Sequence, residues 1–121
     1  MTTTSSNVTQ KKQWITICEL NDILPTMGRG ALLDGKQIAI FRVINTAGIE
    51  ELYAIDNYCP FSKVNTLSRG ITGSLKGKTV VASPLYKQHF DLSTGICLED
   101  ESVKVNTYSV RLNGTTVQLA A

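Results

Sequence analysis

The sequence predicts an all-β domain, built as an antiparallel sandwich or partial barrel of short strands. Short segments rich in β-branched and aromatic residues recur at near-regular spacing along the chain. Glycine-containing turns separate these segments, and no stretch of helical period reaches three turns. Together these features favour antiparallel hairpins over units in which strands and helices alternate.

The expected elements follow one another closely after a polar N-terminal tail. Residues 1–13 contain too little apolar surface to offset the entropy of ordering them, so we expect a disordered tail followed by one domain over 14–121. Residues 21–25 are expected to form a short helical turn or loop that Pro25 ends. The predicted strands are residues 14–18, 31–33, 37–43, 52–55, 79–82, 90–92, 96–98, 108–112 and 115–119.

Turn dipeptides support these hairpins. Asp34-Gly35 and Asn113-Gly114 supply the positive φ angles that tight primed turns require. Further turns are expected at residues 76–78 and 93–95. In the strand after Asp34-Gly35, two sets of side chains alternate, which indicates two different faces: Ile38, Ile40 and Arg42 against Ala39, Phe41 and Val43.

Length and charge exclude several classes of function. A chain of 121 residues is long enough for one hydrophobic core. The formal net charge of +2 comes from scattered basic and acidic residues, so nothing indicates a nucleic-acid partner. No apolar run approaches the roughly 18 to 20 residues that cross a bilayer, and the N-terminus has no apolar signal core. We therefore expect no membrane partner and a cytoplasmic protein.

The three cysteines are odd in number and widely spaced. In a chain without a secretory signal, Cys18, Cys59 and Cys97 are expected to be reduced, buried thiols rather than part of a disulfide framework. Together with the single histidine, His89, they equal the ligand number of a structural zinc site. None of the cysteines has the C-x-x-C spacing typical of zinc ligands, so we expect no metal site.

Two loops are not explained by hairpin patterns, and they cover residues 57–70 and 82–92. The first contains Asn-Tyr-Cys-Pro-Phe and leads to Leu-Ser-Arg-Gly, and the second runs from Ala-Ser-Pro-Leu-Tyr into a Phe-Asp strand. The order and the residue patterns of these two loops resemble those of the Rieske family. In that family the first loop reads Cys-x-His and leads to a Leu-Ser-x-Gly segment. The second reads Cys-Pro-x-His-Gly before a Phe-Asp strand and a Thr-Gly turn. The resemblance implies a Rieske-like fold with the two loops at one tip.

Three of the four cluster ligands are replaced in this sequence. Cys59 matches the first cysteine, whereas Phe61, Ser83 and Tyr86 stand at the other three ligand positions. A Rieske centre needs two thiolates on one iron and two imidazoles on the other, so we expect no 2Fe–2S cluster. His89 lies three residues beyond the ligand position and does not restore the set. We hypothesise that Phe61 and Tyr86 fill the cluster space as an aromatic pair.

A narrower resemblance extends over nearly the whole chain after the tail. Ser-Pro-Leu-Tyr-Lys-Gln at 83–88 and Gly-Ile-Cys-Leu-Glu-Asp at 95–100 resemble the small subunit of assimilatory NADH-dependent nitrite reductase. Further similar segments are Trp14 and residues 22–25, 37–42 and 114–119. The resemblance implies a non-catalytic subunit, with no cofactor and no active site of its own. It also implies a large-subunit partner that carries FAD, an iron–sulfur cluster and sirohaem and reduces nitrite to ammonium in nitrate assimilation.

Some polar residues could have roles of their own. Arg69, Lys87 and Gln88 lie on or beside the two loops, where a Rieske domain meets its partner, so they are candidate docking residues; the alternative is an ordinary solvated loop. His89 is expected to be a surface or hydrogen-bonded residue rather than a catalytic base. The acidic run 99–101 is expected to be solvated rather than a cation site.

Two other functions remain open at this point. One is an electron carrier of the Rieske ferredoxin type with unusual ligands, which predicts iron and visible absorbance. The other is an accessory or regulatory module of a different oxidoreductase.

Overall fold

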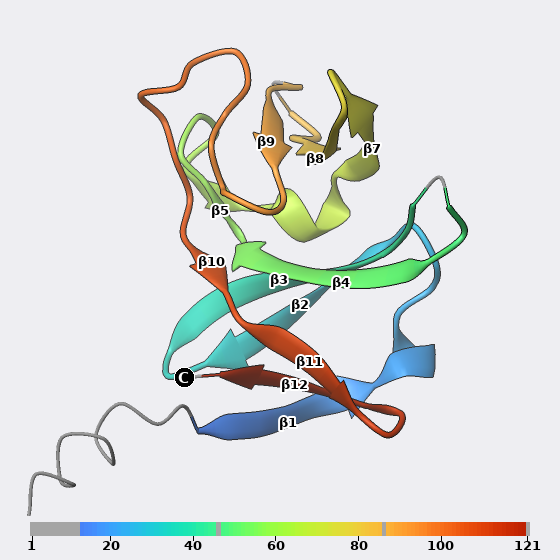
Figure 1. Ribbon diagram of the computed structural model, residues 1–121. Coiled ribbons are helices and arrows are strands. Elements are labelled where there is room, and N and C mark those ends of the chain that lie inside the picture. The colour runs from blue at the N-terminus through green and yellow to red at the C-terminus, as the bar shows by residue number, and fades with distance from the viewer. Residues whose placement is uncertain (1–12, 46, 86, 121) are drawn as a thin grey trace, which may run out of the picture.

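The computed structural model describes residues 13–45, 47–85 and 87–120, and it confirms an all-β architecture (Figure 1). Its regular elements are short strands and two three-residue 3₁₀ helices. In chain order these are β1 (Trp14–Glu19), η1 (Leu20–Asp22), β2 (Gly28–Leu33), β3 (Lys36–Ile44), β4 (Glu50–Asp56), β5 (Tyr58–Cys59), β6 (Val64–Asn65), η2 (Leu67–Arg69), β7 (Ile71–Leu75), β8 (Lys78–Ala82), β9 (His89–Asp91), β10 (Thr107–Tyr108), β11 (Val110–Asn113) and β12 (Thr116–Ala120).

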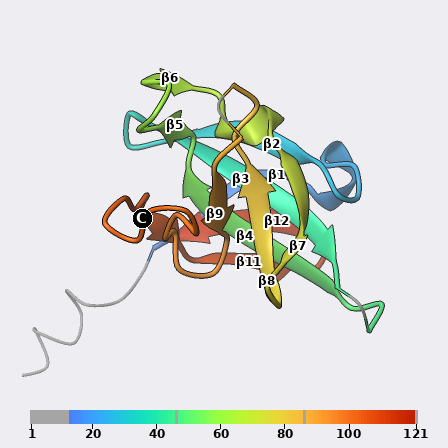
Figure 2. The same ribbon diagram turned by 90° about the horizontal axis from the view of Figure 1, so that it is seen from above.

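The strands form three layers with only antiparallel pairing in the described residues. The central sheet has the order β10-β4-β3-β2. Figure 1 shows the β1-β12-β11 sheet below it and the β7-β8-β9 sheet above it. In Figure 2, the small β5-β6 ribbon lies toward the end of the molecule at which β8 ends.

The central strand β3 supplies side chains to two hydrophobic cores, because successive residues of a strand point to opposite faces of its sheet. The lower core lies toward the β1-β12-β11 sheet and consists of Cys18, Ile23, Leu33, Ile38, Ile40, Ala54, Val117 and Leu119. The upper core lies toward the β7-β8-β9 sheet and consists of Ala39, Phe41, Val43, Ile55, Cys59, Leu67, Val81, Phe90, Leu92, Cys97 and Val105. The alternation expected for this strand is therefore confirmed.

Two tight hairpin turns have the backbone that their sequences require. Asp34 and Gly35 have φ angles of 50° and 78°, as a primed turn between β2 and β3 needs. Lys76 and Gly77 have φ angles of 53° and 75° and connect β7 to β8 in the same way. Lys78 was the last residue of the expected turn 76–78, but it is paired with Leu75 in the β-ladder and belongs to β8.

The last hairpin turn lies one residue later than predicted. Asn113 pairs with Thr116, so the two turn residues are Gly114 and Thr115 rather than Asn113 and Gly114. Gly114 has a φ of 67°. A type II′ turn requires a positive φ at its first turn residue, and glycine adopts this conformation without strain.

Three other element predictions were wrong in part. Residues 96–98 do not form a strand, since Ile96 and Cys97 make only isolated bridges. Residues 108–112 divide at Ser109 between β10, which pairs with β4, and β11, which pairs with β12. The helical turn ends at Asp22 rather than at Pro25, because Ile23 is extended and inserts into the lower core.

The two-residue strands β5 and β6 were not predicted, and neither was β7 (Ile71–Leu75). Its Ile-Thr-Gly-Ser-Leu sequence has little apolar alternation, and it lies at the edge of its sheet, where only one neighbour selects for strand formation. The predicted tail falls almost entirely on residues 1–12, which lie outside the described residues, so the domain boundary stays a prediction. Within the described part of the chain, no helix is long and apolar enough to cross a membrane.

Candidate functional site: two loops at one tip

The two loops singled out in the sequence share one backbone construction. Loop 59–63 begins at Cys59, and the Lys63 N–H donates to the Cys59 carbonyl at 2.7 Å. Loop 83–87 begins at Ser83, and the Lys87 N–H donates to the Ser83 carbonyl at 2.9 Å. In both loops proline is the second residue, and the closing lysine has a positive φ, 61° for Lys63 and 60° for Lys87. We call these segments the twin loops, and the end of the molecule that carries them the tip.

The first residues of the twin loops meet inside the protein. Cys59 Sγ lies 3.5 Å from Ser83 Oγ, and the two residues are 0% and 1% exposed. These are the two positions at which the resemblance predicts the thiolate ligands of a Rieske centre. The fold therefore brings together one predicted pair of ligand positions, although only one of the two still carries sulfur.

The surroundings of Cys59 lower the pKa of its thiol. Burial raises the pKa of the Cys59 thiol, but the neighbouring polar groups of Ser62 and Ser83 and the backbone of the loop outweigh burial and leave the pKa below its usual range. Because the residue is 0% exposed, this sulfur is not open to an external electrophile.

Phe61 packs on the upper core, but its observed partner differs from the expected one. Its ring lies 6.0 Å from that of Phe90, centroid to centroid, with the planes tilted by 51°. This is within the usual range for a favourable aromatic pair. The expected partner, Tyr86, lies outside the described residues, so the Phe61–Tyr86 pair stays a hypothesis. The observed contact with Phe90 packs the first loop against β9.

The side chains present at the tip do not fit a Rieske cluster. Of the described ligand positions, Cys59 offers a thiol, Ser83 a weakly acidic hydroxyl and Phe61 no donor at all. Across the described residues, no three side chains of His, Cys, Asp or Glu come together to hold a metal ion. All three cysteines are buried free thiols, as expected, and Cys18 and Cys97 lie away from the Cys59–Ser83 contact, in the lower core and elsewhere in the upper core.

A buried asparagine fixes the start of the first loop. Asn57 is 5% exposed, and its backbone N–H donates to the Gln37 carbonyl of the central sheet at 3.0 Å. Its side-chain oxygen accepts from the Ser68 N–H at 2.7 Å, and its carbonyl accepts from the Leu67 N–H at 3.0 Å. Asn57 therefore attaches both ends of the segment to one point. The sequence signal for this role is a polar residue directly after the end of β4.

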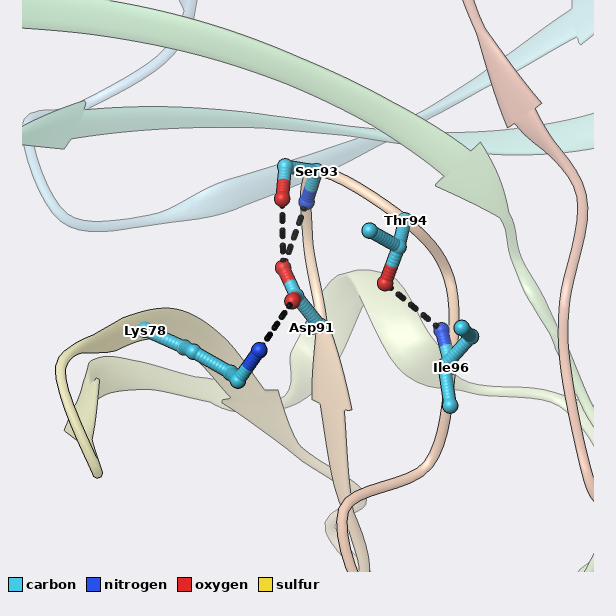
Figure 3. A network of polar contacts seen from close by, with 5 residues as sticks. All are labelled: Lys78, Asp91, Ser93, Thr94 and Ile96. Carbon is cyan, nitrogen blue, oxygen red and sulfur yellow. Dashed lines mark hydrogen bonds and ion pairs between the residues drawn. The ribbon is translucent and has the colours of Figure 1, made fainter. Parts of the chain in front are cut away.

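A buried carboxylate organises the turn after β9 (Figure 3). Asp91 Oδ1 accepts from the Ser93 N–H at 2.9 Å and from its hydroxyl at 2.7 Å, and Lys78 Nζ lies 3.7 Å from Oδ2. Burial raises the pKa of Asp91, but the hydrogen bonds from Ser93 and Thr94, together with the Lys78 charge, leave it below its usual range. Asp91 is therefore a structural carboxylate that holds the predicted turn at 93–95.

His89 is hydrogen-bonded, as expected. Its Nδ1 lies 2.7 Å from Glu99 Oε2, and its backbone N–H donates to Glu99 Oε1 at 2.7 Å. These bonds from His89 outweigh burial and leave the pKa of Glu99 below its usual range. The acidic run is exposed but not merely solvated, because Asp100 Oδ1 also accepts from the Ser102 N–H and hydroxyl. Through its bonds to His89, Glu99 attaches the acidic run to the start of β9, near the tip.

The candidate docking residues lie at the tip but differ in accessibility. Arg69 on η2 and Lys87 are exposed. Gln88 is half-buried, and its carbonyl accepts from the Ser83 N–H at 2.8 Å, so its backbone closes the second loop. Gly70 packs so tightly against Ala82 that an added Cβ would overlap the Ala82 carbonyl oxygen. This contact holds η2 beside the start of the second loop.

Comparison with known proteins defines the family. Residues 13–120 match the family described as Rieske-like 2Fe–2S domain, and the chain belongs to it. Within that family it is 45% identical to the nitrite reductase (NADH) small subunit of Salmonella typhimurium, over 88% of this chain and 96% of the relative. The solved structure of the Escherichia coli protein NirD gives a TM-score of 0.82 at 43% identity, and the match covers 92% of this chain and 98% of that one.

A third relative has a different architecture. The nitrite reductase (NAD(P)H) large subunit of Klebsiella oxytoca contains a segment 37% identical to this chain over 106 residues. The match covers 88% of this chain but only 11% of that much longer protein. In that relative, a domain of this kind is part of the large polypeptide itself.

Proposed function

We propose that this chain is the non-catalytic small subunit of an NAD(P)H-dependent nitrite reductase. It acts by associating with a large subunit that carries FAD, an iron–sulfur cluster and sirohaem, and that reduces nitrite to ammonium. Its place is the cytoplasm, and its physiological role is nitrate assimilation.

The Klebsiella oxytoca relative carries most of the weight of this proposal. In the Klebsiella oxytoca relative this kind of domain is one segment of a large subunit, whereas in other organisms it is a separate small subunit. The domain keeps the same neighbour in both arrangements only if the separate form binds the large chain. Fusion raises the effective concentration of two interacting domains without requiring a new contact surface. The same interface therefore serves both arrangements.

The chemistry of the twin loops supports a role without a cofactor on this chain. One buried thiol paired with a hydroxyl does not supply the two thiolates and two imidazoles of a Rieske centre. For this reason we do not favour the ferredoxin-type electron carrier. A regulatory module for another oxidoreductase lacks any supporting relative among those described above.

Within this proposal, Arg69, Lys87 and Gln88 contact the large subunit. Arg69 and Lys87 are exposed cations at the tip, suited to ion pairs at an interface rim. Gln88 contributes mainly through the loop that its backbone closes.

Reconstitution tests the proposed function. The large subunit of the same organism is purified alone, and NADH-dependent nitrite reduction is measured before and after addition of this chain. We expect the two proteins to elute together in gel filtration, activity to rise on mixing, and the chain alone to be inactive. Separate elution, with no change in activity, would refute the proposal.

A further inference from the structure

Charge is distributed unevenly along the chain. Residues 57–88 contain five lysines and arginines and no aspartate or glutamate, whereas the rest of the chain contains seven basic and ten acidic residues. The segment that forms both twin loops is therefore strongly cationic in a protein whose remainder is slightly acidic. A surface of one sign attracts a surface of the opposite sign and steers their encounter.

Three of these five cations are at the tip. Lys63 and Lys87 close the twin loops and Arg69 ends η2, and all three are exposed. Lys76 and Lys78 lie at the opposite end of their sheet, around the β7–β8 turn, where Lys78 is paired with Asp91. The acidic segment 99–101 is attached to the start of β9, where its Glu99 is already bonded to His89. Among the described residues, no carboxylate forms an ion pair with Lys63, Arg69 or Lys87.

The two loop lysines occupy an unfavourable backbone conformation. Each has a φ near +60°, a region that glycine adopts freely and that other residues enter at a cost. Glycine at either position would relieve this strain. Strained positions are frequent where a side chain binds something, because the local cost is offset by function.

Exposed apolar side chains lie on the same segments of the chain as these cations. Tyr58 and Val64 on the β5-β6 ribbon are 46% and 45% exposed, and Leu85 in the second loop is 60% exposed. Apolar contacts with a cationic rim are typical of protein–protein interfaces, where aromatic residues at the centre contribute most of the affinity.

We propose that the tip is an interface for an acidic face of the large subunit, in which Lys63 and Lys87 are paired electrostatic contacts and Tyr58, Val64 and Leu85 are the apolar ones. This inference rests on the proposed function and specifies the chemistry of its partner. Lys63 joins Lys87 because the twin loops place the two lysines at equivalent positions. The twin loops thereby have a proposed role that does not involve cluster chemistry.

Charge reversal gives the direct test. Affinity for the separately purified large subunit is measured by biolayer interferometry for the unaltered chain and for the Lys63→Glu/Lys87→Glu variant. The control variant is Lys36→Glu/Lys76→Glu, which changes net charge equally at exposed lysines away from the tip, and Lys76 has the same positive φ. We expect Kd to rise about tenfold or more for the tip variant and to change little for the control. We also expect the difference to shrink between about 50 mM and about 500 mM salt.

A glycine variant separates binding from folding. Lys63→Gly/Lys87→Gly removes both charges and relieves both positive φ angles, so its Tm should rise while its affinity for the large subunit falls. A merely structural role for the lysines would not move stability and affinity in opposite directions. Unchanged affinity in this variant would overturn the inference.

The remaining outcomes are also decisive. Failure of the unaltered chain to bind the large subunit at low salt would refute the proposed function and the inference with it. Equal binding by the unaltered, tip and control proteins would overturn the inference alone and leave the proposed function standing. Tighter, lysine-dependent binding to a single-stranded oligonucleotide or to phosphatidylserine vesicles than to the large subunit would show a general polyanion surface and overturn the inference.

Discussion

The two cores on either face of the central sheet are constructed differently. The buried residues of the lower core are aliphatic apart from Cys18, and the sheet of β1, β12 and β11 encloses them. The upper core contains Phe41, Phe90 and two cysteines, and around it lie the buried polar residues Asn57, Ser83 and Asp91. Apolar burial is the main contribution to the stability of the lower core, whereas the upper core also depends on specific hydrogen bonds to loop backbone.

This difference shows how a Rieske-like fold closes its tip without cluster ligands. A 2Fe–2S cluster joins two loops through iron–ligand bonds. In this chain the same loops are joined by the Cys59–Ser83 contact and by the tilted packing of Phe61 against Phe90. Asn57 and Asp91 fix the segments next to these loops. The upper core is therefore where single substitutions are expected to be most informative.

The largest effect is expected from Phe90→Ala. Phe90 is 0% exposed, so the substitution removes a fully buried ring, leaves a cavity and deprives Phe61 of its partner. We expect a loss of about 3 to 5 kcal/mol in the free energy of unfolding, measured by urea denaturation. Leu119→Ala in the lower core is the matched control, with an expected loss of about 2 to 5 kcal/mol but no loosening of the tip in hydrogen exchange. If Phe90→Ala cost less than about 1 kcal/mol, the upper core would not depend on this ring.

The next effect concerns the buried carboxylate of Asp91. Its folded-state pKa is lowered, so it contributes stability that is present above the unfolded value of about 3.9 and is lost as pH falls through the folded value. Asp91→Asn should cost about 1 to 2 kcal/mol at neutral pH and should flatten the acid limb of the stability curve. Urea denaturation at a series of pH values checks this. A parallel acid limb in both proteins would mean that other carboxylates control acid stability.

A smaller effect is expected where the lower core meets β10. The Tyr108 hydroxyl donates to Asp56 Oδ1 at 2.5 Å, and burial, followed by this bond and the Asp56 charge, raises the pKa of Tyr108 to about 12. Tyr108→Phe should cost about 0.5 to 1.5 kcal/mol. Because the folded pKa lies above the unfolded one, this contribution is complete below about pH 10 and is lost as pH rises toward the folded value. Ultraviolet titration of the tyrosines should lose its highest step in the variant.

The smallest effect on stability is expected at the Cys59–Ser83 contact. Ser83→Ala removes a hydrogen bond that helps to lower the pKa of the Cys59 thiol, so this pKa should rise. The loss of stability should be about 1 kcal/mol or less, since a neutral hydrogen bond contributes little net free energy. Thiolate absorbance measured against pH, with Cys18→Ala/Cys97→Ala as background, follows Cys59 alone. A pKa that does not move would mean that Ser62 and the loop backbone set it without Ser83.

Sequence patterns predicted the lower half of the molecule better than the upper half. Hairpin dipeptides and the alternation in β3 identified β2, β3, β11 and β12, because local turn geometry and side-chain period determine these elements. They failed at β7, which has no regular alternation, and at residues 96–98, where tertiary contacts replace a ladder. The ligand positions inferred from resemblance stay a prediction. The pairing of Phe61 with Phe90 and the equivalence of Lys63 and Lys87 depend on loop backbone that the residue types alone do not specify.

The most direct test of the account is the metal content and visible spectrum of the chain purified anaerobically from iron-replete cells, with a Rieske ferredoxin prepared in parallel. The central claim is that side chains, not a cluster, close the tip. It predicts a colourless protein without iron or zinc, whose free energy of unfolding is unchanged by a chelator, beside a coloured ferredoxin. Stoichiometric iron with a charge-transfer band, and destabilisation by the chelator, would contradict it.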